Sequence, residues 1–197
     1  MLSKETAQHL SNGGVVAYPT STLPGLACLP TSDALDALFA LKQRSADKPV
    51  SLGVLSLEQA ENLVVVPEKV RRLEAVFPKG GFTFILDAVN PLDARLGGHR
   101  VAVRCLAHPI ARQLVETFGP ITATSANESG EIPEATAEEA GAILGLPAHA
   151  VLPGDCPGGK GSTILNVTQG EQGVEVTVMR EGIIPTRSVV QWWKNPT

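Results

Sequence analysis

The 197-residue sequence is poor in the residues that mark several common protein classes. It contains three cysteines, Cys28, Cys105 and Cys156, which lie far apart and include no Cys-x-x-Cys pair. An odd, scattered set of this kind predicts neither a disulfide framework nor a zinc site. The four histidines also lack the spacing of metal ligands. We therefore expect no metal held by the protein itself.

Long apolar segments and a strong excess of one charge are missing as well. The N-terminus, Met-Leu-Ser-Lys-Glu-Thr, has no apolar signal core, and no window approaches a membrane span. We therefore expect a cytoplasmic protein without a membrane anchor. The net charge of -4 argues against a broad, non-specific nucleic-acid surface. Any anion site must be a local cluster of cations.

Apolar residues are plentiful enough for a packed core. The chain is 43% hydrophobic and 18% charged, which is too apolar for a disordered chain. Domains usually run to about 100–200 residues, and we find no repeat, linker or low-complexity tract. We therefore expect residues 1–197 to form a single domain.

The densest group of cations lies in residues 41–49, which carry Lys42, Arg44 and Lys48. Apolar residues at helical spacing predict a helix before this stretch, and the run 50–55 predicts a strand after it. Such a junction suits a multiply charged anion, because Arg holds phosphate oxygens in a fork and Lys adds mobile charge. On spacing alone, a solvated helix end with basic residues facing the helix dipole is the commoner explanation.

Hydroxyl and amide side chains follow two predicted strands. The strand 15–18 leads into Pro19-Thr20-Ser21-Thr22, and the strand 121–124 leads into Ser125-Ala126-Asn127. Ligands of α/β proteins bind outside the carboxyl ends of strands, so these side chains are candidates for ligand contacts. Turns of this composition are equally common without a ligand.

A third predicted strand, residues 99–104, has two different faces. Val101 and Val103 share one face, while Arg100 and Arg104 share the other. The guanidinium of Arg104 therefore points either into a cleft or into bulk water, and the spacing favours neither.

The segment 154–161 reads Gly-Asp-Cys-Pro-Gly-Gly-Lys-Gly, which nearly matches a Walker A motif. Gly161 replaces the Ser or Thr that would hold magnesium, and the residues that follow predict a strand, not a helix with an anion-binding N-terminus. We therefore reject a P-loop and expect a mobile loop with Ser162 at its rim.

Eight distinct short segments follow one another along the chain in a definite order. They are Tyr18-Pro19-Thr20-Ser21-Thr22, Lys42-Gln43-Arg44 with Lys48-Pro49, Thr83-Phe84-Ile85-Leu86, Val101-Ala102-Val103-Arg104, His108-Pro109, Thr124-Ser125-Ala126-Asn127, Ser162-Thr163-Ile164 and Arg180-Glu181-Gly182. In this order the chain resembles the YrdC-like family over residues 5–184. The combination carries the resemblance, and no single segment does.

The resemblance implies an α/β fold, with a twisted mixed β-sheet flanked by helices and a deep concave cleft. It also implies a nucleotidyltransferase that joins L-threonine, bicarbonate and ATP into threonylcarbamoyl-adenylate and releases pyrophosphate. The product serves threonylcarbamoyladenosine modification of tRNA, which a separate transferase complex completes. Mg²⁺ is expected to ride on the triphosphate. The residues fit this chemistry, because attack on phosphorus needs cations and oriented donors more than a covalent nucleophile.

Matching positions imply roles for particular residues, with Lys42 and Arg44 beside the phosphates as catalytic residues. The residues implied to contact ATP are Arg44, Lys48, Thr124, Ser125, Asn127 and Arg180. The residues implied to hold L-threonine are Thr22, Arg104, Thr122 and Ser162, with Arg104 pairing the carboxylate. Ser21 stands where the family usually has a glutamate, a difference that bears on amino-acid specificity.

Two other functions stay open. A non-catalytic relative that binds double-stranded RNA or tRNA in the cleft would show salt-steep RNA affinity and no pyrophosphate release. The acidic net charge and the lack of interleaved aromatic residues count against it. A carbamoyl-transfer enzyme of another pathway is the third possibility, although such chains carry acylphosphatase and zinc-finger segments that this sequence lacks.

Overall fold

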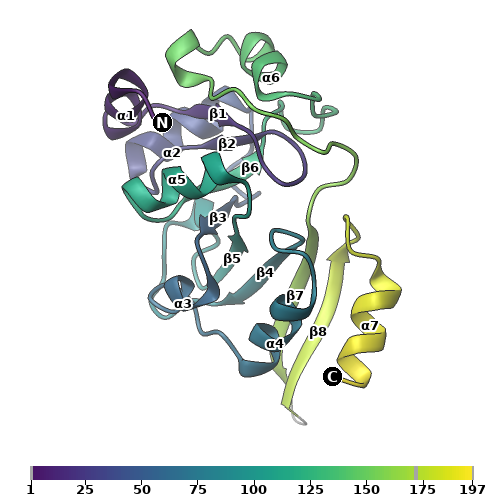
Figure 1. The fold of residues 1–197 in the computed structure, drawn as a ribbon. Coiled ribbons are helices and arrows are strands. Elements are labelled where there is room, and N and C mark those ends of the chain that lie inside the picture. The colour runs from purple at the N-terminus through teal and green to yellow at the C-terminus, as the bar shows by residue number, and fades with distance from the viewer. Residues whose placement is uncertain (1, 171–172, 197) are drawn as a thin grey trace.

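The computed structural model describes residues 2–170 and 173–196. One twisted, open sheet of eight strands runs through them, in the order β1-β2-β6-β3-β5-β4-β7-β8 (Figure 1). The strands are β1 Val16–Tyr18, β2 Gly25–Ala27, β3 Ser51–Val54, β4 Phe82–Asp87, β5 Arg100–Cys105, β6 Ile121–Ser125, β7 Thr163–Gly170 and β8 Gly173–Arg180. The pairs β3–β5 and β4–β7 are parallel, and the others are antiparallel. The mixed α/β sheet predicted from the sequence is confirmed.

Helices pack on this sheet through two apolar clusters. The helices are α1 Lys4–Ser11, α2 Ser32–Leu41, α3 Leu57–Ala60, α4 Glu68–Val76, α5 Pro109–Phe118, α6 Ala137–Ile143 and α7 Thr186–Lys194. The larger cluster joins α2, α4 and α7 to the central strands, and the smaller one joins α1 and α5 to β1 and β2. Figure 1 shows α7 beside β8, at the opposite end of the sheet from α1. Among the described helices, none combines the length and apolarity needed to cross a membrane.

Capping residues explain where several helices begin. The Ser3 hydroxyl accepts a hydrogen bond from the Thr6 amide at the start of α1. His108 caps α5 ahead of the proline at its first position. The segment Thr136-Ala137-Glu138-Glu139 predicts a capping box, and Thr136 and Glu139 form a complete one at the start of α6. These local signals set the helix starts independently of the sheet.

The strand β5 has the two faces that its alternation predicts. Val101 and Val103 are fully buried in the larger apolar cluster. Arg100 and Arg104, on the other face, border a large cavity. The strand therefore divides the core from the cavity.

Two elements differ from the sequence prediction. The strand β2 is not predicted, because a run of three residues that begins with glycine gives no strand signal. A Cβ atom at Gly25 would lie 2.9 Å from the Tyr18 ring, so only glycine allows β2 to pair closely with β1. The sequence also predicts a strand near Ala150, and this prediction is wrong, because Ala148–Ala150 form a 3₁₀ turn and Val151 alone of these residues bridges to β1.

Candidate active site

A cavity of about 800 Å³ opens along the polar face of the central strands. Its wall combines the turn after β1, the loop after α2, the polar face of β5, the end of β6 and the rim formed by residues 160–162 with the end of β8. These segments are far apart in the sequence, and the sheet brings them together. The concave cleft expected from the sequence is therefore present.

The lining of this cavity is positively charged. Its cations are Arg44, Arg100, Arg104, Lys160 and Arg180. Among the described residues, its carboxylates are Glu131 and Glu181. A net positive lining in a chain of net charge -4 concentrates anion-binding capacity in one place.

Arg104 is the most buried of the cations that line the cavity, at 9% exposed, and its end of the cavity is called the enclosed end below. Its Nε donates to the Gly80 carbonyl at 3.0 Å, and its Nη2 donates to the Thr22 hydroxyl at 2.8 Å. Burial lowers the pKa of Arg104, but an arginine starts so far above neutrality that it keeps its proton. Because both partners are neutral, the positive charge is oriented without being cancelled.

Hydroxyl groups surround the Arg104 end of the cavity. Thr83 Oγ1 and Ser162 Oγ lie 2.7 Å apart and are buried. Thr20 Oγ1 lies 3.2 Å from Thr22 Oγ1 and donates to the Leu23 carbonyl at 2.7 Å. Short, fixed hydroxyls beside one arginine suit a small substrate that carries a carboxylate and further polar groups.

Arg44 reaches the cavity from the loop after α2. Its Nε donates to the Lys48 carbonyl at 2.6 Å, and its Nη2 donates to the Pro49 carbonyl at 3.0 Å. These two bonds hold the guanidinium against the loop, and partial burial lowers its pKa. Lys48 is exposed and is absent from the cavity wall, so the structure uses its carbonyl and leaves its ammonium outside.

Lys42 lies behind the cavity wall, whereas the family resemblance implied a position beside the phosphates. Its side chain is 1% exposed, and its Nζ donates to the carbonyls of Ser125, at 2.5 Å, and Asn127, at 2.6 Å. Burial lowers the pKa of Lys42 to about 8. Gln43 adopts a left-handed backbone (φ 47), and this bend directs Lys42 into the protein and Arg44 into the cavity.

Thr122 is also turned away from the cavity. It is fully buried in β6, and its hydroxyl accepts a hydrogen bond from the Cys28 amide at 2.9 Å. The end of the same strand, Thr124 and Ser125, does border the cavity. Thr122 and Thr124 are two residues apart, so alternation alone would place them on one face. They pair with different strands, Thr122 with Leu52 of β3 and Thr124 with Leu26 of β2, and this change of neighbour separates them.

Asn127 presents a buried oxygen beside the cavity. Its Nδ2 donates to the carbonyls of Glu128 and Glu131, both at 2.7 Å. Its Oδ1 is buried and has no hydrogen-bond partner among the described residues. Buried acceptors are normally satisfied, so this unpartnered oxygen is an exception.

Arg180 completes the opposite rim. Its Nη2 donates to the Ser162 carbonyl at 3.0 Å. A Cβ atom at Gly161 would lie 3.1 Å from the same nitrogen, so glycine lets the guanidinium approach the loop. Lys160 and Glu181 form an ion pair of 3.1 Å at this rim.

The structure therefore brings most of the predicted residues together. Those that border the cavity are Thr22, Arg44, Arg104, Thr124, Ser125, Asn127, Ser162 and Arg180. Those that do not are Lys42, Lys48 and Thr122. Two further lining cations, Arg100 and Lys160, were not predicted as site residues from the sequence. The alternation of β5 could have identified Arg100, whereas Lys160 lies in the loop rejected as a P-loop.

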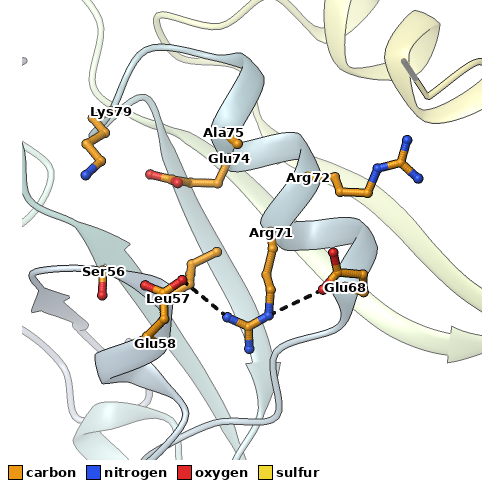
Figure 2. Close-up of a pocket in the computed structure, with 9 residues that line it drawn as sticks. All are labelled: Ser56, Leu57, Glu58, Glu68, Arg71, Arg72, Glu74, Ala75 and Lys79. Carbon is orange, nitrogen blue, oxygen red and sulfur yellow. Dashed lines mark ion pairs between the residues drawn. The ribbon is translucent and has the colours of Figure 1, made fainter.

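A second, smaller hollow of about 360 Å³ lies between α3, α4 and Lys79 (Figure 2). Arg71 reaches toward Glu58 and Glu68, with a nitrogen–oxygen distance of 3.7 Å to each. It also pairs with Glu61. Carboxylates therefore surround this arginine, and the hollow offers an anion little uncompensated charge.

Comparison with known sequences gives a consistent assignment. The sequence model of the Sua5/YciO/YrdC family, which carries the description telomere recombination, matches residues 8–182. A threonylcarbamoyl-AMP synthase of Vibrio parahaemolyticus is 36% identical over 79% of this chain and 88% of its own length. One of Methylobacillus flagellatus is 34% identical over 86% of this chain and 97% of its own length.

Solved structures agree. The crystal structure of P. abyssi Sua5 complexed with L-threonine has a TM-score of 0.80 and 29% identity over 94% of this chain, which spans 55% of that longer chain. E. coli YciO has a TM-score of 0.74 and 25% identity, covering 93% of this chain and 90% of its own. The predicted resemblance is confirmed: the chain belongs to the Sua5/YciO/YrdC family.

Proposed function

We propose that this chain is a threonylcarbamoyl-AMP synthase that joins L-threonine, bicarbonate and ATP and releases pyrophosphate. The observation that carries the proposal is that Arg44, Arg104 and Arg180 all border one cavity. Among the described residues, none of these three arginines forms an ion pair with a carboxylate. Relatives named for this activity and the structure of P. abyssi Sua5 complexed with L-threonine support it.

The enclosed end of the cavity is the proposed threonine site. Arg104 pairs the substrate carboxylate, because its charge is oriented by neutral partners and shielded from water. The hydroxyls of Thr22 and Ser162 orient the remaining polar groups. The Ser21 hydroxyl lies 3.5 Å from the Arg104 guanidinium, at the position where the family usually has a glutamate. Because this difference bears on amino-acid specificity, serine and other polar amino acids belong in any specificity test.

The wider part of the cavity is the proposed nucleotide site. Arg44 and Arg180 approach from different segments of its wall and contact the phosphates. Thr124, Ser125 and Asn127 line the nucleoside side, where the free Asn127 Oδ1 can accept an N–H group.

Mg²⁺ enters with the triphosphate as part of the substrate. Of the two described carboxylates in the lining, Glu181 is already paired with Lys160 and with the Thr186 amide. Such a lining offers no carboxylate cage, whereas Mg²⁺ binds readily to phosphate oxygens while keeping several waters. No catalytic step is therefore assigned to a protein-held metal.

Lys42, Lys48 and Thr122 receive supporting roles in this proposal. Lys42 holds the chain that carries Ser125 and Asn127 through two carbonyls, and it does not touch the phosphates. The Lys48 carbonyl orients Arg44. Thr122 ties β6 to the Cys28 amide.

The chemistry follows from these positions. The threonine amine attacks the carbon of bicarbonate, and loss of water leaves a carbamate. A carbamate oxygen then bonds to the α-phosphorus of ATP, while the bond to the bridging oxygen breaks and pyrophosphate leaves with its electron pair. Because anions meet and another anion departs, fixed cations and donors lower the barrier. No covalent intermediate with a side chain is required.

The product, threonylcarbamoyl-AMP, suits a separate transferase that modifies tRNA in the cytoplasm. We place the whole reaction within one domain formed by this chain.

The test is pyrophosphate release from ATP and bicarbonate with a panel of amino acids. L-threonine is expected to stimulate release above every other amino acid and above a sample without one. Stimulation by a different amino acid would assign another substrate to the same site. Absence of release with all of them, together with salt-steep binding of double-stranded RNA, would favour the non-catalytic alternative.

A further inference from the structure

Lys160 is a lining cation to which the proposed mechanism gives no role. It belongs to the glycine-rich loop 154–161, which precedes the strand β7 and so cannot act as a P-loop. Its ammonium lies 3.1 Å from the Glu181 carboxylate, and the two side chains are 65% and 43% exposed. Exposed ion pairs contribute only about 0.2–1 kcal/mol, so a stronger anion can take the place of the carboxylate.

Of the two partners, Glu181 is the fixed one. Its second oxygen accepts a hydrogen bond from the Thr186 amide at 2.9 Å, at the start of α7. Lys160 follows Gly158 and Gly159, whose φ values of 73 and 80 lie in the left-handed region that glycine adopts freely. The ammonium can therefore leave the carboxylate while Glu181 stays in place.

The loop is tied on both sides of Lys160. The Gly158 amide donates to the Thr22 carbonyl at 3.0 Å, on the proposed threonine side. The Ile183 amide donates to the Gly161 carbonyl at 2.9 Å, beside the end of β8. Between these ties, Lys160 lies at the same rim as Arg180. The rim thus carries two cations that come from different elements.

We propose that Lys160 binds the outer phosphates of the nucleotide and that Glu181 holds its ammonium at the rim until a triphosphate enters. The identity of the nucleotide rests on the proposed function. A triphosphate tail brings several negative charges and exchanges readily with a single exposed carboxylate. Bicarbonate and the threonine carboxylate carry one charge each, and Arg104 already serves the enclosed end.

The test is binding of ATP and of AMP, measured by calorimetry without threonine or bicarbonate. Lys160→Met keeps the length of the side chain and removes its charge, and it is expected to weaken ATP about tenfold, the loss of one charge-assisted contact. AMP lacks the outer phosphates, so its affinity should change less than about twofold. Lys160→Arg should retain most of the ATP affinity, and Glu181→Gln should leave it unchanged or raise it.

Lys4→Met is the matched control, because Lys4 is exposed at the start of α1 and does not line the cavity. Equal losses for ATP and AMP, or no loss for either, would overturn the inference. A Glu181→Gln variant as weak as Lys160→Met would also overturn it, because the pair would then be a structural unit. Wild-type protein that binds ATP through Lys160 but releases no pyrophosphate with threonine would sink the proposed function alone.

Discussion

Both hollows described above contain arginine, and they differ in what surrounds it. In the hollow between α3 and α4, Arg71 pairs with Glu58, Glu61 and Glu68 (Figure 2). In the larger cavity, Arg104 donates to a carbonyl and a hydroxyl. Neutral oxygens orient a guanidinium and leave its positive charge in place, whereas carboxylates orient the guanidinium and also neutralise its charge. The difference teaches that the partners of a cation, more than the number of cations, identify an anion site.

The largest effect that the comparison predicts follows from Arg104→Met. Loss of the buried charge should lower kcat/KM for threonine about thirtyfold or more, since truncating one member of a desolvated charge pair costs about 2–5 kcal/mol. Steady-state pyrophosphate release, with threonine and ATP varied separately, measures this loss. A smaller effect on ATP is expected. Equal effects on threonine and ATP would contradict the role of Arg104 in binding threonine.

Lys42→Met tests a cation outside the cavity. Like Arg104, Lys42 donates to neutral oxygens, here two backbone carbonyls. The substitution leaves the carbonyls of Ser125 and Asn127 without their donor, so the free energy of unfolding should fall by about 2–3 kcal/mol. Urea unfolding at pH 7 measures the change. An unchanged midpoint would show that water replaces the ammonium at no cost.

The same lysine predicts a pH dependence with a definite sign. Its pKa is about 8 in the folded protein and 10.5 ordinarily, so between these values the unfolded chain binds more protons. Its burial therefore costs stability below pH 8, and this cost disappears as the pH rises toward 10.5. The stability of the wild type relative to Lys42→Met should rise across this window. A flat or falling difference would contradict the lowered pKa.

Arg44→Ala should have an intermediate effect, confined to the nucleotide. Removing one phosphate contact is expected to weaken ATP about tenfold while the melting temperature stays near that of the wild type. Calorimetry with ATP measures the affinity, and threonine titration serves as the internal control. Unchanged ATP affinity would refute the role proposed for Arg44.

The smallest effect is expected for Arg71→Ala, in the hollow of Figure 2. Its partners are 50–77% exposed, so the stability change should stay within about 1 kcal/mol. Binding of ATP should not change. A loss of ATP affinity comparable with that of Arg44→Ala would break the contrast between the two hollows.

Local signals made much of the fold predictable. Capping residues fixed the starts of α1, α5 and α6, and the alternation of β5 separated Val101 and Val103 from Arg100 and Arg104. Most of the site residues that the family resemblance implied also border the cavity.

Some of the implied residues lie outside the cavity wall because backbone geometry overrides spacing. Lys42 and Arg44 look equivalent at a helix end, and nothing in the residue type of Gln43 indicates its left-handed backbone. Thr122 and Thr124 are the same residue type in the same strand, but Thr122 pairs with β3 and Thr124 pairs with β2. This pairing depends on strands that are distant in the sequence. Lys160 lies in a loop that resembles a P-loop only in part, and its place at the cavity rim depends on the distant end of β8.

The strand order has a consequence for how the protein is made. Residues near 22, 44, 104, 125, 162 and 180 all contribute to one cavity, and β4 pairs with β7 across about eighty intervening residues of chain. During synthesis the N-terminal strands therefore leave the ribosome well before their ligand-binding partners exist. Contacts this distant in sequence form late and slowly. Binding competence should thus emerge in a single step at the end of folding, and nucleotide added to a refolding mixture should stabilise only the finished chain.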